Sequence, residues 1–247
     1  MSNLVKHQAY TPEDAEAEAT DMDRAQADFM KLGEGRTVIR ILPALVGKGY
    51  GPNKTSPFKT VWTHFLSKPL SSETLSTACP SRELNQPCMA CEMANKLKAK
   101  GNKIDTDRAY QLFPKRRVYM CVIDREAPEK GVQVLGVGKT IHESLTKIRK
   151  DVDAGGDFTD PGPEGFDIII ERKGSGLTTE YTVMPARKPS PLGNMEWVEQ
   201  VPNLDVFAKV KGEKLAEFFG LPAVEEKQIS SKSKLRTAAD DMGDVEV

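Results

Sequence analysis

The chain has 247 residues, of which 38% are hydrophobic and 29% charged, enough for one substantial domain or two small ones. It has no apolar run of 18 residues, no apolar stretch near the N-terminus and four cysteines, which argues against a membrane span, a signal peptide and a disulfide framework. Its net charge of -1 includes -6 over residues 13–28, +8 over residues 29–236 and -4 over residues 237–247; the basic middle predicts a polyanionic ligand, with solvated charge as the alternative.

The first elements along the chain are an acidic arm and two strands. Residues 1–28 are rich in Ala, Glu and Asp, and we predict a flexible arm there. Residues 36–43 (RTVIRILP) and 58–66 (FKTVWTHFL) have the composition of β-strands. The period of two in the second strand places Phe58, Thr60, Trp62 and His64 on one side.

A cluster of metal-ligand residues follows. His64, Cys79, Cys88 and Cys91 lie within 28 residues, and the last two form a Cys-x-x-Cys turn that lets two thiolates chelate one ion. Zn²⁺ suits mixed sulfur and nitrogen ligands, and four protein ligands leave no position for a substrate. We therefore predict one structural zinc ion. The alternative is a group of small buried thiols with an ordinary histidine.

The rest of the chain predicts two helices, two strands, a hairpin and a helical C-terminal stretch. Helical patterns cover residues 89–100 and 139–152, strands cover 115–123 and 132–137, and a hairpin joins 166–173 to 178–184 through a turn at 174–176. A last helix is expected around residues 205–219. These elements predict a mainly β fold with helices (α+β), an OB-fold barrel of five or six strands with an inserted zinc-binding subdomain.

The predicted organisation has four parts. They are an acidic flexible arm over 1–28, an OB-fold core over 29–200 with the zinc subdomain at about 64–100, a helical extension over 201–224 and a disordered acidic tail over 225–247.

Aromatic and cationic residues alternate around the strand at 115–123. The triplet Lys115, Arg116 and Arg117 is flanked by Tyr110, Phe113 and Tyr119. Cations neutralise phosphates without reading sequence, and aromatic rings stack on unpaired bases, at about 1–3 kcal/mol for each base. A duplex hides its base faces, so this combination favours single strands. In the alternative, Phe113 and Tyr119 are core residues and the triplet is a solvated strand start.

Several other strand residues are weaker candidates for contacts with DNA. They are cations or aromatics on the predicted strands or just after the hairpin: Arg36, Arg40, Lys59, Trp62, Arg172, Lys173, Tyr181 and Arg187. Trp62 is as well suited to packing inside the barrel.

The motifs together resemble the gene-32-type family, the replication single-stranded-DNA-binding proteins of large tailed phages. The resemblance covers roughly residues 29–190. It rests on the GRTVIRILP strand, the His before Cys…Cys-x-x-Cys, the Tyr followed by a basic cluster, DREAPEKG at 124–131, GKTI at 138–141 and EGF at 164–166.

This resemblance implies a fold, ligands and partners. It implies an OB fold with zinc bound by His64, Cys79, Cys88 and Cys91, and a DNA cleft lined by Tyr110, Lys115, Arg116, Arg117, Tyr119 and Tyr181. It implies self-association along DNA, and contact of an acidic C-terminal tail, here Asp240, Asp241, Asp244 and Glu246, with replication and recombination proteins. The family's basic N-terminal segment, which drives cooperative binding, is replaced here by acidic residues 13–28.

Enzymatic functions fit the sequence less well. The sequence PCMAC at 87–91 matches half of the zinc-deaminase signature, but His64 is followed by Phe65 and Leu66 rather than by the required His-x-Glu. No cluster of carboxylates in the basic body stands out as a nuclease Mg²⁺ site. The main alternative is a zinc-ribbon or OB adaptor, such as a helicase-loading or recombination mediator protein.

We therefore expect a non-enzymatic protein that coats and protects single-stranded DNA without sequence preference during phage replication, recombination and repair. We expect it on DNA in the cytoplasm of the bacterial host, with no membrane contact.

Overall fold

The computed structural model describes residues 28–45, 49–68, 72–151, 153 and 157–220. Except for Asp28, the predicted acidic arm lies outside the described residues, as do the predicted tail and its acids Asp240, Asp241, Asp244 and Glu246. Within the described part of the chain, no helix is both long and apolar enough to cross a bilayer.

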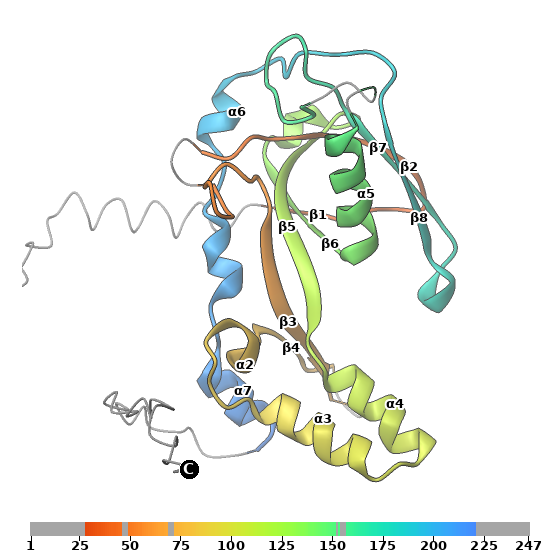
Figure 1. Ribbon diagram of the computed structural model, residues 1–247, viewed down its shortest axis with the longest axis vertical. Coiled ribbons are helices and arrows are strands. Elements are labelled where there is room, and N and C mark those ends of the chain that lie inside the picture. Colours follow the sequence, from red (N-terminus) through yellow and green to blue (C-terminus); the bar gives the residue numbers. More distant parts are fainter. Residues whose placement is uncertain (1–27, 46–48, 69–71, 152, 154–156, 221–247) are drawn as a thin grey trace, which may run out of the picture.

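The described residues form one sheet of eight strands (Figure 1). Its main path runs β1-β6-β5-β2-β7-β8, and β3 pairs with both β4 and β5. The pairs are antiparallel except for β1 with β6. The strand bounds are β1 (Phe29–Met30), β2 (Gly35–Ile41), β3 (Lys59–Ser67), β4 (Thr74–Ala78), β5 (Lys115–Asp124), β6 (Gln133–Val137), β7 (Ile168–Lys173) and β8 (Glu180–Pro185).

Strand β5 is the centre of this sheet. One edge pairs with β6 over residues 118–122, and the other pairs first with β3 over 115–119 and then with β2 over 122–124. Successive side chains point to opposite faces, so Val118, Met120 and Val122 enter one core and Tyr119, Cys121 and Ile123 enter another. Burial on both faces explains the unbroken apolar run in this strand.

A different element covers each face of β5. Helix α5 (Lys139–Lys150) buries Ile141, Leu145 and Ile148, which its helical period places on one stripe, against the core with Val118. We call this side the α5 face, and Figure 1 shows the helix lying over it. The C-terminal segment with α6 (Glu196–Glu199) and the 3-10 helix η3 (Leu204–Ala208) packs on the other side, the opposite face.

The remaining helices gather at one end of β3 and β4. They are α2 (Pro80–Glu83), α3 (Met89–Ala99), α4 (Lys103–Leu112) and α7 (Gly212–Phe218), which lie together at the lower end of Figure 1. Leu215 and Phe218 of α7 share a core with Leu66, Cys79 and Cys88. We call these helices, with β4, the metal lobe. Two short 3-10 helices complete the fold, η1 (Pro128–Lys130) and η2 (Gly176–Thr178).

Most predicted elements are present, and the mixed α+β class is confirmed. The strands over 36–43, 58–66, 115–123 and 132–137 and the helices over 89–100 and 139–152 match observed elements with shifts of one or two residues. The sheet has eight strands rather than five or six, because the short β1 and β4 also join it. The helix predicted around 205–219 is two helices, η3 and α7, separated by extended backbone at Lys209.

Candidate metal centre and nucleic-acid interface

The four metal-ligand candidates come together from three elements of the fold. His64 is on β3, Cys79 immediately precedes α2, and Cys88 and Cys91 bracket the first turn of α3. The pairing of β3 with β4 sets His64 opposite Thr77, two residues before Cys79. As a result, the four ligand atoms all lie within 4.8 Å of one another.

Their separations fit a tetrahedral zinc site. Cys79 Sγ lies 3.7 Å from Cys91 Sγ, and His64 Nε2 lies 3.3 Å from Cys88 Sγ and 3.9 Å from Cys91 Sγ. With zinc–sulfur bonds of about 2.3 Å and zinc–nitrogen bonds of about 2.0–2.1 Å, a tetrahedron requires about 3.8 Å between sulfurs and about 3.6 Å between sulfur and nitrogen. The donor set and its spacing therefore match one zinc ion.

The surroundings orient the ligands and close the site. His64 Nδ1 donates a hydrogen bond to the Leu112 carbonyl oxygen at 2.7 Å, which leaves Nε2 facing the thiols. His64, Cys79 and Cys88 are buried, the two thiols in the core that includes Leu66 and Phe218. Cys91 is partly exposed, but four protein ligands already complete the coordination and leave no open position, as in structural zinc sites.

Three thiols packed this closely are difficult to ionise together. Burial, followed by the neighbouring thiols of Cys88 and Cys79, raises the pKa of Cys91. Thiolates are the form that binds metal, so ionising these cysteines together requires a compensating cation. A divalent ion at this position would supply that charge.

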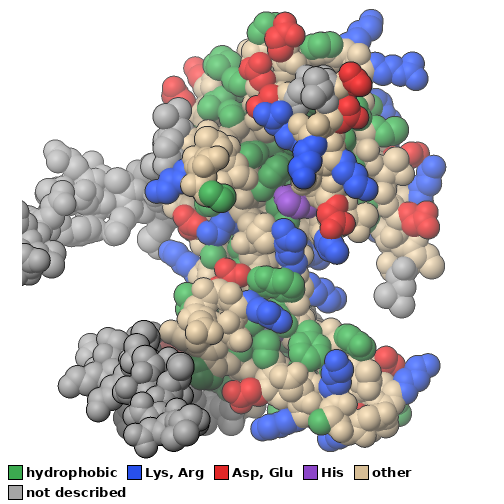
Figure 2. Space-filling view, in the orientation of Figure 1, with side chains coloured by type: hydrophobic (Ala, Val, Ile, Leu, Met, Phe, Trp, Pro, Cys, Tyr) green, Lys and Arg blue, Asp and Glu red, His purple; other side chains and the backbone are tan. Residues whose placement is uncertain are grey.

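Next to the metal centre, the α5 face carries an aromatic and a cationic side chain from neighbouring strands. Arg116 alternates with Val118 and therefore lies on the α5 face, and Trp62 is its register partner on β3. Trp62 packs against the metal-lobe core, two residues from His64. Figure 2 shows the molecule narrowing between α5 and the metal lobe, with Lys, Arg and hydrophobic side chains around this waist.

Two residues that the sequence did not single out stand beside this pair. The His142 ring of α5 lies 5.2 Å from the Phe58 ring, and burial, followed by the charge of Arg116, lowers the pKa of His142. From the metal lobe, Arg82 Cζ lies 5.3 Å from the centroid of the Trp62 ring. A lone histidine and a lone arginine carry no pattern in the sequence, and the fold is what brings them to the waist.

The structure does not keep the cationic triplet on one face. Because side chains alternate along β5, Lys115 and Arg117 project to the opposite face while Arg116 projects to the α5 face. Arg117 Cζ lies 5.0 Å from the centroid of the Phe65 ring on that opposite face. A single cleft that uses all three cations equally does not fit this alternation.

Tyr119 and Arg40 are placed where contact with DNA does not fit. Tyr119 is 7% exposed and stacks on Phe207, with ring centroids 4.4 Å apart, so its ring is covered by protein. Arg40 is 0% exposed, and its Nε donates to Asp167 Oδ1 at 2.9 Å. Its guanidinium also donates to Ser190 and to the Asp160 carbonyl oxygen. Both side chains are therefore engaged in contacts inside the protein.

The hairpin candidates divide between the faces. Arg172 on β7 and Tyr181 on β8 are register partners, and alternation with Ile168 and Ile170 places Arg172 on the α5 face. Tyr181 packs against the α5-face core. Lys173 is exposed, alternates to the opposite face and pairs with Glu171 at 3.4 Å.

The remaining candidates for contact with DNA lie on the opposite face or on other elements than β3 and β5. Arg36 is exposed and lies on the opposite face of β2, and Lys59 forms an ion pair with Asp205. Tyr110 on α4 is 60% exposed, with its ring centroid 6.5 Å from that of the half-buried Phe113. Arg187 is exposed just after β8.

A comparison with protein families adds an independent finding. A family model described as "gp32 DNA binding protein like" matches residues 33–218, a span that contains all of the described helices and every strand except β1. No curated protein matches the chain.

Proposed function

The chain belongs to the gp32 DNA-binding-protein-like family, and from this premise we propose that it binds single-stranded DNA without sequence preference and without catalysing a reaction. The proposed site is the waist on the α5 face, between α5 and the metal lobe. Its central residues are Trp62 and Arg116, and it continues toward Arg172 and Tyr181 on the hairpin.

One observation carries this proposal: Arg116 and Trp62 are register partners on the same face of neighbouring strands. Partners directly opposite in an antiparallel pair have Cβ atoms about 4.5–5.5 Å apart, so a cation and an indole are presented side by side. The cation neutralises phosphates, and the indole offers a face on which an unpaired base stacks. A duplex keeps its bases stacked inside, so the indole contact favours a single strand.

The metal centre supports this surface from one side. His64, Cys79, Cys88 and Cys91 would hold one zinc ion, which contributes folding energy to the metal lobe when bound. His64 lies two residues from Trp62 on β3, so the same ligand set fixes the end of the strand that carries the indole. This role is structural rather than catalytic.

The wider role follows the family. We propose an OB-type arrangement of the sheet and a protein that coats and protects unpaired DNA during phage replication, recombination and repair. Asp240, Asp241, Asp244 and Glu246 would bind partner proteins through an acidic tail, since the charge of -4 over residues 237–247 contrasts with the basic body.

A titration tests the proposal. Fluorescently labelled oligo-dT, a mixed-sequence single strand and a duplex of equal length are each titrated with the full-length protein at about 50 mM and about 200 mM salt. We expect the two single strands to bind with similar affinity and more tightly than the duplex, and all affinities to fall with salt. Equal or tighter duplex binding, or no binding, would overturn the proposed function.

A further inference from the structure

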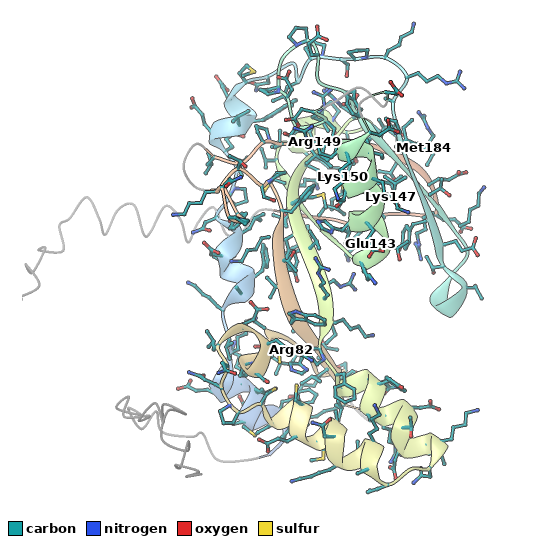
Figure 3. The ribbon with its side chains drawn as sticks, in the orientation of Figure 1. Arg82, Glu143, Lys147, Arg149, Lys150 and Met184 are labelled. Carbon is teal, nitrogen blue, oxygen red and sulfur yellow. The ribbon has the colours of Figure 1, made fainter. Side chains whose placement is uncertain are left out.

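Arg82 lies over the ring of Trp62, the side chain on which we propose that a base stacks, and it has no charged partner among the described residues. Its Cζ is 5.3 Å from the centroid of the Trp62 ring, and its side chain is exposed. Among the described residues, no carboxylate forms an ion pair with Arg82. Figure 3 shows Arg82 beside β3 and β5, where the metal lobe meets the waist. Its positive charge is therefore available to an anion that enters the waist.

Two hydrogen bonds to the Trp62 backbone hold the helix that carries Arg82 in this position. The Trp62 N–H donates to Glu83 Oε1 at 2.8 Å, and the Cys79 N–H donates to the Trp62 carbonyl oxygen at 2.7 Å. The N–H and the carbonyl oxygen of Trp62 are thus both bonded to residues at the ends of the short helix that carries Arg82. Cys79 also belongs to the metal cluster, which further fixes the start of this helix.

We propose that Arg82 and Trp62 form a clamp for one nucleotide of the bound strand, an inference that rests on the proposed function. In the free protein the guanidinium rests on the indole. In the complex a base lies between them, stacked on the indole on one side and on the planar guanidinium on the other. The positive charge of Arg82 then lies beside the phosphate backbone and strengthens binding at low salt.

The dimensions allow this insertion with a small movement. Stacked groups sit about 3.5–4.0 Å apart, so a base between two flat groups needs about 7 Å. The present separation of 5.3 Å must therefore widen by about 2 Å, which rotation of an exposed arginine side chain provides. The backbone of α2 and its bonds to Trp62 need not move.

The test isolates the fluorescence of Trp62. The chain has two tryptophans, so a Trp197→Phe parent reports on Trp62 alone. In this parent we expect oligo-dT to change the Trp62 emission. Arg82→Ala should weaken oligo-dT binding about 5- to 150-fold, the equivalent of one stacked base, and reduce the slope of log affinity against log salt by about 0.7. Arg82→Lys should keep the salt slope and recover part of the affinity, because it restores charge without the planar stack.

A matched control removes one cation far from the clamp. Lys130 is exposed in η1, which follows the opposite end of β5 from the metal lobe. Lys130→Ala should change oligo-dT affinity less than about twofold, since it removes a charge without removing a stacking group. A weakening equal to that of Arg82→Ala would contradict a clamp and indicate a general charge effect.

The outcomes separate this inference from the proposed function. If the parent binds oligo-dT but Arg82→Ala keeps the same affinity and salt slope, the clamp is wrong and the proposed function stands. If the parent does not bind oligo-dT, the proposed function itself fails. Melting temperature and zinc content are measured for each variant. If Arg82→Ala loses zinc, Arg82→Gln provides the same test, because its aliphatic stem still packs on the indole.

Discussion

Asp167 binds two arginine side chains, the buried Arg40 and the partly exposed Arg125. Its Oδ1 accepts hydrogen bonds from Arg40 Nε and Arg125 Nε, both at 2.9 Å, and its Oδ2 accepts one from Ser190. Burial lowers the pKa of Arg40, and the carboxylate of Asp167 opposes that shift. The network joins β2 to the segment after β8, so its loss should be felt in stability rather than in DNA contact.

The first prediction concerns this carboxylate. Asp167→Ala should reduce the free energy of unfolding by about 3–5 kcal/mol, because it leaves the buried Arg40 guanidinium without its counter-charge. Urea denaturation measures the change. Asp157→Ala is the control: its ion pair with Arg149 is exposed on both sides and should contribute about 0–1 kcal/mol. Similar losses in both variants would show that the buried network contributes no more to stability than an exposed ion pair.

The second prediction concerns the metal ligands. Cys88→Ser should lower the melting temperature and the zinc content, because it removes one of four ligands from a buried site. Cys121→Ser is the matched control, since Cys121 is buried in a core away from the metal cluster. It should lose stability while retaining one zinc ion per chain. A Cys88→Ser protein with normal zinc content and stability would contradict the structural metal site.

The third prediction follows from His142. Burial and Arg116 lower its pKa from the ordinary value of 6.5, so the unfolded chain binds a proton at a higher pH than the folded one. Stability should therefore fall as pH drops below about 6.5 toward the folded pKa. Between about pH 7.5 and about pH 5.5, His142→Gln should lose less stability than the unsubstituted protein in urea denaturation. Equal losses would show that His142 titrates normally.

At the residue scale, the metal ligands could be predicted from their spacing, whereas the exposure of single side chains could not. His64, Cys79, Cys88 and Cys91 were identified because a chelating turn leaves its mark in the sequence. Arg40 was predicted as a DNA contact because it is a cation on a predicted strand, and Tyr119 because it flanks the cationic triplet and matches the family's cleft. Their burial depends on Asp167 and Phe207, which lie 127 and 88 residues away and gave no signal of that pairing.

At the scale of elements, β5 determines which cations share a face. Its alternation separates Arg116, next to Trp62, from Arg117, next to Phe65. The strand itself was predictable from its apolar run. The division of its cations could also have been predicted from the period of two, but which face holds DNA depends on α5 and the metal lobe.

The fourth prediction uses this alternation. Arg116→Ala should weaken oligo-dT binding more than Arg117→Ala, because only the first removes a cation from the α5 face. The two variants delete the same group from adjacent residues, so each controls for the other. Fluorescence anisotropy at low salt measures the difference. A larger effect of Arg117→Ala would place the DNA on the opposite face, and equal effects would contradict the preference for the α5 face.

Short and irregular elements were harder to predict than β5. Helix α4 is capped by Asn102, whose side chain accepts a hydrogen bond from the Asp105 N–H. Ala109 is its one buried residue, so the helix has no clear apolar stripe in the sequence. Strand β4 has five residues and carries little alternation of its own. It forms on the edge of β3 that β5 leaves free, since Thr63 pairs with Ala78 of β4 and with Lys115 of β5.

At the scale of the whole molecule, the fold places two different supports around one surface. The sheet and α5 form one side of the waist, and the metal lobe with α7 forms the other (Figure 1). The return of α7 to the metal lobe connects the C-terminal part of the described chain to the zinc ligands. Charge segregation was visible in the sequence, whereas this long-range packing depends on contacts between distant segments.

The most direct test of the account is to map where a single strand lies. An oligo-dT substituted with a photoreactive thymine analogue is cross-linked to the full-length protein, and the modified residues are identified by mass spectrometry. The account predicts cross-links at Trp62, and at Tyr181 on the hairpin of the same face. Cross-links confined to Phe65 and other residues of the opposite face would contradict it.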